Sequence, residues 1–166
     1  MNVLVAYQSQ SGNTKKVAET IYNEIKTDKA IKEIKDLDEL EGYDLYFVGF
    51  PIQAYGPANV AKLFLEKHAA GKDIALFVTH ASPEDRDILQ EWLDNCKKAA
   101  AGANIVGMFN CQGELAKDVA DFMLNSGDAQ LAEWAKERDT TIGQPDETRL
   151  ERARIYARDI MQKYSK

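Results

Sequence analysis

Short apolar runs alternate with longer amphipathic stretches along most of the chain, and this alternation constrains the fold more than any other feature. Four of these runs have five or six mostly apolar residues, which is typical of a strand buried on both faces of a sheet, whereas residues 30–34 form a weaker, short strand candidate whose charges suit an edge position. The stretches between the runs carry apolar residues at helical spacing. Alternating strands and helices predict a parallel sheet with right-handed crossovers and helices on both faces. The predicted strands span residues 2–7, 30–34, 45–50, 74–78 and 105–109.

Helix starts are marked between these strands. Residues 14–27 carry an apolar stripe directly after the first strand. Gly56-Pro57 ends a loop and is predicted to place its proline in the first turn of the next helix. Ser82-Pro83, followed by two acids, predicts a capped helix start, and Pro145-Asp146 opens the last helix.

The length favours one domain. A chain of 166 residues has the size of a single domain, and no linker, repeat or low-complexity tract divides residues 1–166. An extra segment at about 112–145 separates the last predicted strand from the last helix. We expect Phe122 and Trp134 in this segment to belong to the core. Two short helices are predicted within it, at about residues 114–124 and 128–138.

Charge and cysteine content exclude several classes of function. Lys and Arg total 21 against 27 Asp and Glu, and this acidic balance argues against a nucleic-acid partner. Cys96 and Cys111 stand too far apart for a CxxC pair and are too few for a disulfide scaffold, as expected in a reducing cytosol. The sequence has neither a signal peptide nor an 18-residue apolar run. We therefore expect a cytoplasmic protein with no membrane partner, and the oligomeric state stays open.

The predicted sheet also locates the functional loops. Parallel sheets bind ligands beyond the carboxyl ends of their strands, where the strand order reverses. The sequence offers no GxGxxG, GxSxG or HExxH motif, and no set of metal ligands. Function is therefore expected in the loops that follow the strands, at residues 8–14, 51–57, 79–83 and 110–113.

The first of these loops has the composition of an anion site. It contains the hydroxyls of Ser9, Ser11 and Thr14, together with Gly12 and Asn13, and it runs directly into a helix. Free amides at a helix start, combined with the helix dipole, bind anions. No lysine lies inside the loop, which suits a phosphomonoester better than a nucleoside triphosphate. The alternative is a polar turn that only begins the helix.

The run Ser9-Gln10-Ser11-Gly12-Asn13-Thr14 resembles the phosphate loop of the flavodoxin family, whose pattern is [ST]-x-[ST]-G-x-[ST]. The similarity in element order covers about residues 1–111 and the final helix, whereas 112–145 is not part of the short flavodoxin pattern. The resemblance implies a flavodoxin-like, doubly wound three-layer α/β sandwich with a five-stranded parallel sheet in the order 2-1-3-4-5. It also implies FMN as the cofactor, with its phosphate in this loop.

The same resemblance implies that two further loops flank the flavin ring. Tyr55 is the candidate to stack on the ring, and the small residues Ala54 and Gly56 would permit a peptide flip. His80 is a candidate to stack on the ring or to donate to its pyrimidine oxygens. The alternatives are a tyrosine that packs on its neighbours and a histidine with a structural role. The other residues expected to contact the cofactor are Pro51, Ile52, Gln53, Thr79, Ala81 and Ser82.

Three functions follow from the resemblance, and no catalytic residue is assigned in any of them. We favour an electron carrier that takes electrons from a reductase and passes them to an acceptor enzyme, with the acidic surface helping partners to dock. The second is an FMN-dependent NAD(P)H:quinone or other oxidoreductase, in which 112–145 forms a pocket wall or an oligomer contact. The third is a non-redox interaction module on the same fold.

Overall fold

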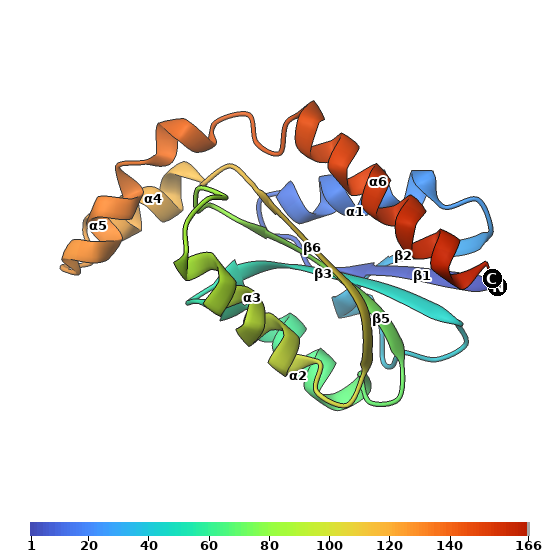
Figure 1. The fold of residues 1–166 in the computed structure, drawn as a ribbon. Coiled ribbons are helices and arrows are strands. Elements are labelled where there is room, and N and C mark those ends of the chain that lie inside the picture. The colour runs from blue at the N-terminus through green and yellow to red at the C-terminus, as the bar shows by residue number, and fades with distance from the viewer. Residues whose placement is uncertain (166) are drawn as a thin grey trace.

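The structure of the protein is a computed structural model, and residues 1–165 are described. Its parallel sheet has the strand order β2-β1-β3-β5-β6 (Figure 1). Numbered among the parallel strands alone, this is the predicted order 2-1-3-4-5. The strands are β1 (Asn2–Tyr7), β2 (Asp28–Glu33), β3 (Leu45–Gln53), β5 (Asp73–His80) and β6 (Asn104–Gln112), and the short β4 (Gly56–Pro57) pairs antiparallel with β3.

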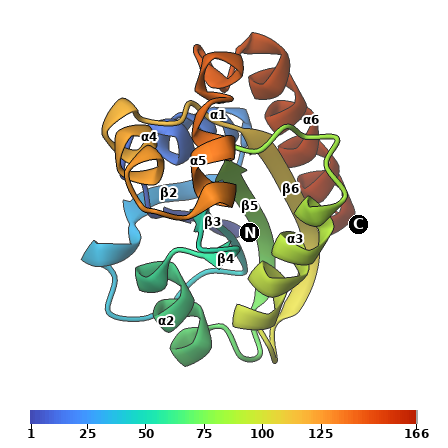
Figure 2. The same cartoon turned by 90° about the vertical axis from the view of Figure 1, so that its left-hand side faces the viewer.

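Helices cover both faces of the sheet and confirm the three-layer sandwich. Helices α1 (Asn13–Glu24) and α6 (Glu147–Tyr164) lie on one face. Helices α2 (Asn59–His68) and α3 (Ile88–Ala99) lie on the other, as Figures 1 and 2 show from two sides. No helix within residues 1–165 is both long enough and apolar enough to span a membrane.

Two apolar cores explain why the inner strands of the sheet are hydrophobic on both faces. Along β1, Val3 and Val5 belong to the core beneath α1 and α6, whereas Leu4 and Ala6 belong to the core beneath α2 and α3. All four side chains are buried. Full burial of such an aliphatic side chain contributes about 1.5–3 kcal/mol. The inner strands such as β1 are therefore apolar on both faces because both faces are covered, whereas the edge strand β2 carries charges and is exposed at Asp28 and Lys32.

Two predicted helix starts are wrong. Gly56-Pro57 pairs with Ile52 and Gln53 as the short strand β4, so α2 begins only at Asn59. Ser82-Pro83 does not begin α3, which starts at Ile88. The Ser82 hydroxyl donates instead to the Pro83 carbonyl at 3.0 Å. Both turns match the local chemistry of a helix start, but strand pairing in one case and distant ion pairs in the other fix a different conformation.

Residues 113–144, here called the cover segment, project beyond the carboxyl edge of the sheet (Figures 1 and 2). The two predicted helices are present but shorter, as α4 (Lys117–Leu124) and α5 (Ala129–Ala135), followed by the 3-10 helix η2 (Arg138–Thr141). The expectation that Phe122 is a core residue is wrong, because its side chain is 71% exposed. Trp134 is half-buried and packs against the core on the α2/α3 side.

Candidate functional site

The loop between β1 and α1 is organised around Ser9 and Gly12. The Ser9 hydroxyl accepts hydrogen bonds from the backbone amides of Gly12, at 3.1 Å, and of Lys15, at 3.2 Å. Gly12 adopts a φ of 96°, a left-handed conformation that favours glycine, and it is the residue from which α1 starts. The first-turn amides of α1 have no acceptor within the helix. Ser9 takes up the Gly12 and Lys15 amides, so the loop presents the other first-turn amides at the positive end of the helix dipole.

Thr14 adds a buried hydroxyl to this loop. Its Oγ1 lies 2.8 Å from Oγ1 of Thr79, at the end of β5, and both side chains are buried. One of the two hydroxyls donates to the other, so one O–H donor of the pair is left for a ligand. The contact joins the first loop to the carboxyl end of a strand 65 positions away.

Side-chain amides join the phosphate loop to the two loops beside it. Gln53 Nε2 donates to Gln10 Oε1 at 2.6 Å, and Asn13 Nδ2 donates to the Glu114 carbonyl at 2.9 Å. The second contact needs Gly113, because a Cβ there would lie 2.5 Å from Asn13 Nδ2. Three loops that are distant in sequence are therefore held together around one space.

That space is a cavity of about 620 Å³, here called the phosphate-loop cavity. Its lining includes two acids and no Lys or Arg among the described residues. The Glu114 carboxylate is engaged by the Gly143 amide at 3.1 Å and by Arg138 at 3.5 Å. An anion here would thus be held by neutral donors. The lining residues are Ser9, Gln10, Ser11, Asn13, Thr14, Pro51, Ile52, Gln53, Thr79, His80, Ala81, Gly113, Glu114, Leu115, Ala116, Asp118 and Val119.

A tight turn follows β3 at Ala54 and Tyr55. These are the only non-glycine residues with positive φ in the described chain, at 49° and 69°. Because the flanking Gln53 and Gly56 pair across the turn, this is a two-residue hairpin loop with positive φ at both central positions. Residues other than glycine are strained at positive φ, at a cost of about 1–3 kcal/mol each. The strain lies at Ala54 and Tyr55, and Gly56 has an ordinary φ.

The turn places Tyr55 in a cluster of three aromatic rings. Its ring centroid lies 5.7 Å from that of Trp92 on α3 and 5.9 Å from that of Trp134 on α5, and the two tryptophans are 5.7 Å apart. The Tyr55 carbonyl also accepts a hydrogen bond from Asn95 Nδ2 at 3.0 Å. In this conformation Tyr55 packs on its neighbours, as its structural alternative predicted, and it remains 45% exposed.

The cluster lines a second cavity of about 460 Å³, here called the aromatic cavity. It shares a wall with the phosphate-loop cavity, formed in part by Ile52, His80 and Val119. The only charged residues in its lining, Arg86 and Glu137, form an ion pair with each other. The lining residues are Ile52, Gln53, Ala54, Tyr55, His80, Ala81, Ser82, Arg86, Trp92, Leu115, Val119, Phe122, Met123, Leu131, Trp134 and Glu137.

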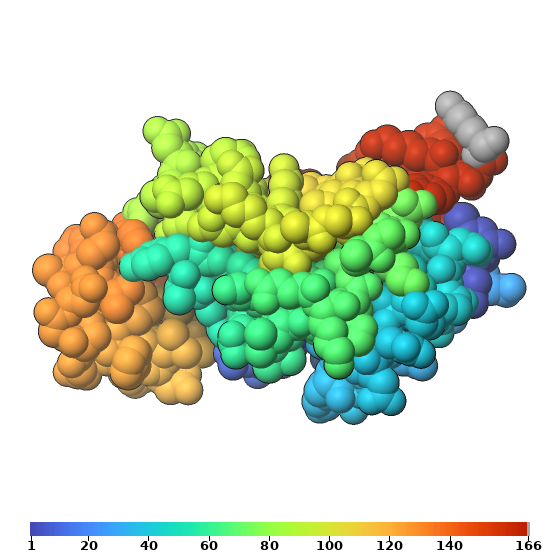
Figure 3. All heavy atoms as spheres, turned by 90° about the horizontal axis from the view of Figure 1, so that it is seen from below, coloured from blue at the N-terminus to red at the C-terminus, as the bar shows by residue number. Residues whose placement is uncertain are grey.

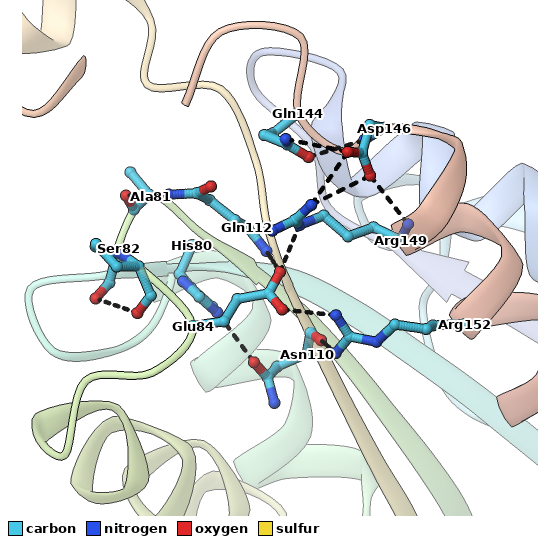
Figure 4. Close-up of polar contacts among 11 residues, drawn as sticks. His80, Ala81, Ser82, Glu84, Asn110, Gln112, Gln144, Asp146, Arg149 and Arg152 are labelled. Atoms are coloured by element: carbon cyan, nitrogen blue, oxygen red, sulfur yellow. Dashed lines mark hydrogen bonds and ion pairs between the residues drawn. The ribbon is translucent and has the colours of Figure 1, made fainter. Parts of the chain in front are cut away.

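His80 faces both cavities from the end of β5. Its Nε2 lies 3.0 Å from Asn110 Oδ1, which makes Nε2 the donor and leaves Nδ1 as an acceptor (Figure 4). Burial lowers the pKa of the imidazole and outweighs the bond to Asn110, so the ring is neutral near pH 7. Among buried side-chain nitrogens and oxygens of residues 1–165, Nδ1 alone has no hydrogen-bond partner. The contact of His80 with a flavin ring stays a prediction, and Nδ1 is the ring atom available for it.

Glu84 anchors the loop that carries Ser82. Its carboxylate bonds to Arg149 Nε and to Arg152 Nη1, both at 2.6 Å, and it accepts from the Gln112 amide at 3.0 Å (Figure 4). These contacts lower the pKa of Glu84 although burial opposes the shift. These contacts explain why Glu84 does not lie in the first turn of α3. Two arginines of α6 hold its carboxylate instead.

Cys111 takes no visible part in this site. It is buried, and burial raises the pKa of its thiol to about 12. A thiol with such a pKa stays protonated at neutral pH, and a protonated thiol is a poor nucleophile. Cys111 is therefore a buried, unreactive thiol.

Fourteen of the sixteen residues predicted to bind the cofactor line one of the two cavities. The exceptions are Gly12, which shapes its loop, and Gly56, which is buried in the hairpin. From the sequence, 112–145 is a pocket wall only in the second hypothesis, and no single residue of this segment is assigned to the site. Trp92, which lines the aromatic cavity from α3, is not assigned either.

Comparison with known proteins gives consistent results. A family model described as "Flavodoxin domain" matches residues 4–158. The curated "Flavodoxin-like domain-containing protein BilS" of Clostridioides difficile (strain CD3) is 30% identical over 99% of both chains.

Solved structures share the fold. A flavodoxin from the domain Archaea matches with a TM-score of 0.63 and 20% identity over 100% of both chains. Flavodoxin 2 from Bacillus cereus matches with a TM-score of 0.64 and 20% identity over 98% of this chain and 99% of that one. A Lactobacillus acidophilus flavoprotein, solved in complex with FMN, matches with a TM-score of 0.54 and 24% identity. The match covers 66% of this chain and 92% of that one.

Proposed function

Because the chain belongs to the flavodoxin domain family, we propose that it binds FMN and carries electrons from a reductase to an acceptor enzyme. The observation that carries this proposal is a fit between the cavities and the cofactor. A loop of neutral anion donors faces the first cavity, and the unpartnered Nδ1 of His80 lies on the wall shared with the second. FMN has a phosphate at one end and an N–H donor on its ring at the other.

The phosphate would be held by the loop from Ser9 to Thr14. The free amides at the start of α1 and the hydroxyls of Ser11 and Thr14 are its donors. Hydrogen bonds to a charged group contribute about 1.5–3 kcal/mol each, so a few neutral donors are sufficient without a lysine. Ser9 acts differently, because its hydroxyl already accepts two amides and braces the loop.

The ring would lie against the loops of residues 51–56 and 79–82, in the aromatic cavity. The neutral imidazole of His80 is suited to accept the ring N–H at Nδ1, and Tyr55 and Trp92 supply apolar area that excludes water. Bound FMN supplies the redox chemistry, while the protein sets its environment. The remaining predicted contacts, from Pro51 to Gly56 and from Thr79 to Ser82, stay part of this proposal.

The test is the visible absorbance spectrum of the purified protein, followed by titration of the flavin-free protein with FMN. We expect stoichiometric binding at micromolar FMN. His80→Leu removes the acceptor at similar volume and is expected to weaken both FMN and riboflavin, whereas His68→Leu on α2, outside both cavities, should weaken neither. A protein that binds no FMN at micromolar concentration would instead favour the non-redox interaction module.

A second candidate, a flavin-dependent oxidoreductase, is favoured by one observation. The cover segment supplies a wall of the aromatic cavity through Leu115, Met123, Leu131 and other side chains, and such a wall suits a small apolar substrate. The discriminating assay is oxidation of NAD(P)H with a quinone by the FMN-loaded protein alone. Turnover without added reductase supports the enzyme, and its absence, together with rapid single-electron exchange with a redox protein, supports the carrier.

A further inference from the structure

The two edges of the sheet differ in charge. At one edge, four of the six residues of β2 are charged. At the other edge, β6 is the nine-residue run NIVGMFNCQ, which contains neither a charged residue nor a proline. Charged side chains and prolines are common means by which an edge strand avoids pairing with another chain. Of the two edges, β6 is therefore the one suited to accept a further strand.

Backbone groups on the outer side of β6 are engaged near its end. The Gln112 amide donates to Glu84 Oε1 at 3.0 Å, and the Asn110 carbonyl accepts from Arg152 Nη2 at 3.4 Å. Because successive residues of a strand direct their N–H and C=O groups to opposite sides, Met108 also faces outward. No strand within residues 1–165 lies on that side of Met108. Its N–H and C=O groups are therefore available to a second chain.

A groove of about 320 Å³ lies between this edge and α6. Helix α6 is close to the strand, because a Cβ at Gly107 would lie 2.5 Å from Ile160 Cδ1. The helix presents Arg152, Ile155 and Asp159 to the groove, and Ile155 is 45% exposed. Figure 3 shows the start of β6, coloured yellow, and α6, coloured red, along the same long side of the molecule. An apolar side chain between opposite charges thus borders the open strand.

We propose that this face, here called the β6 edge and formed by Met108, Arg152, Ile155 and Asp159, is the interface with a second copy of the chain, related by a two-fold axis. The two β6 strands pair antiparallel at Met108, and the two α6 helices meet beside them at Ile155. Arg152 and Asp159 lie on either side of Ile155, so each Arg152 faces the Asp159 of the other copy. Such a two-fold contact, in which one surface pairs with itself, is the commonest kind in oligomers.

Two separate patterns place the axis at the same point. On α6, the positive and the negative charge that line the groove lie three and four residues from Ile155. Tyr156, the next residue, stacks on Phe109 with 5.5 Å between the ring centroids, which brings this part of the helix beside Met108. An axis through Met108 therefore passes close to Ile155. A bulge at Val106, which has no partner in β5, keeps the paired stretch short.

A dimer of this kind leaves both proposed cofactor sites open. The two cavities of each copy lie beyond the carboxyl ends of the strands, and antiparallel pairing of β6 places the two carboxyl edges at opposite ends of the dimer. Pairing of β6 with β2 of another copy would instead build an open filament, and the charges of β2 disfavour it. The interface is thus independent of the proposed function.

The experiment measures the mass of the full chain in solution by analytical ultracentrifugation. We expect the wild type to be a dimer at micromolar concentration. Ile155→Asp and Ile155→Lys each place two like charges at the axis, and each is expected to raise the dissociation constant of the dimer about 100-fold or more. Because residue 155 faces its own counterpart, an equimolar mixture of the two variants should restore the dimer. Leu63→Asp and Leu63→Lys, at a 57%-exposed position of α2, should change nothing.

A wild type that stays monomeric at high micromolar concentration would overturn the interface. A dimer that survives both substitutions of Ile155, or a polymer in place of a dimer, would also overturn it. Two monomeric variants that do not associate when mixed would refute an axis at Ile155. Circular dichroism and the FMN titration are expected to be the same for the variants and the wild type. If no form of the protein takes up FMN, the proposed function fails and the dimer remains expected.

Two further measurements locate the contact without a charge substitution. Ile155→Cys is expected to form a covalent dimer on mild oxidation and Leu63→Cys is not, since the native Cys96 and Cys111 are buried. In the wild type, the outward amide of Met108 should be protected from hydrogen exchange in the dimer and should exchange faster on dilution to the monomer. Equal cross-linking of the two cysteine variants, or exchange at Met108 that does not depend on protein concentration, would refute the β6 edge as the interface.

Discussion

The two adjoining cavities are built from different kinds of sequence. The phosphate-loop cavity depends on a continuous run of small polar residues between Ser9 and Thr14, whose amides and hydroxyls act locally. The aromatic cavity is assembled from the turn at Ala54 and Tyr55, from Trp92 on α3 and from the cover segment, which come together only in the folded chain. The first is expected to determine which cofactor binds, and the second what approaches it.

The largest expected effect separates the two cavities by the ligand they recognise. Combining Ser11→Ala with Thr14→Val removes two neutral donors to the phosphate, each worth about 1.5–3 kcal/mol. We expect FMN affinity to fall about 100-fold or more and riboflavin affinity to stay within about 3-fold, because riboflavin lacks the phosphate. Quenching of flavin fluorescence measures both.

The control for this variant is Thr20→Val. It removes a hydroxyl of α1 that donates to the Lys16 carbonyl, outside the phosphate loop. It should leave both affinities unchanged. An equal loss of FMN and riboflavin in the double variant would mean that the loop does not hold the phosphate.

A smaller effect is expected from the aromatic cavity, and it should not distinguish the two flavins. Trp134→Ala removes one ring of the cluster, and aromatic pairs contribute about 0.5–1.5 kcal/mol beyond their buried area. We expect both FMN and riboflavin to bind about 10-fold more weakly in the same titration. Ile155→Ala, at a half-exposed position of α6 outside the aromatic cavity, is the control, and a loss confined to FMN would contradict the assignment.

The strained turn predicts a change in stability. Ala54→Gly relieves a positive φ of 49° and is expected to raise the free energy of unfolding of the flavin-free protein by about 0.5–1 kcal/mol. The same substitution within α5, Ala132→Gly, should lower it by about 0.5–1 kcal/mol. Urea denaturation measures both. A decrease at both positions would show that the turn is not strained in solution.

The smallest expected effect concerns His80 and pH. Because its pKa in the folded protein lies below the ordinary value of 6.5, the unfolded chain binds the proton first as the pH falls. The free energy of unfolding should therefore decrease as the pH drops below 6.5. His80→Gln should flatten this decrease between pH 7 and 5.5, whereas His68→Gln should retain it. Identical pH profiles for wild type and His80→Gln would remove the basis for a buried neutral imidazole.

Local chemistry made the strands and the polar loop after the first strand predictable from the sequence, whereas the order of the strands came from the family resemblance. Continuous apolar runs such as Leu45 to Phe50 are typical of strands covered on both sides, and hydroxyls beside a glycine at a helix start are typical of an anion site. Prediction failed where partners are distant. Ser82-Pro83 has every local sign of a helix start, but Glu84 is held by Arg149 and Arg152, 65 and 68 positions away.

The aromatic cavity shows the same limit in another form. The Ala54–Tyr55 turn has neither the Asn nor the Gly that usually marks such hairpins, so only the pairing of Gln53 with Gly56 reveals it. Trp134 and Phe122 lie on neighbouring short helices with similar local patterns, yet one is half-buried and the other is exposed. Helical spacing indicates that a helix has an apolar face, but not whether another element of the fold covers that face.

The two ends of the cover segment meet. The Glu114 amide donates to the Gln144 carbonyl at 2.9 Å, and the Leu115 amide donates to Thr141 Oγ1 at 2.9 Å. The chain therefore leaves the sandwich and returns to it at a single point, as inserted domains and permissive exchange sites do. A segment closed at its base in this way is where changes of length are expected to disturb the strands least. Evolution and protein engineering alike can therefore alter what this scaffold recognises by exchanging one excursion of the chain, while the rest of the architecture is inherited unchanged.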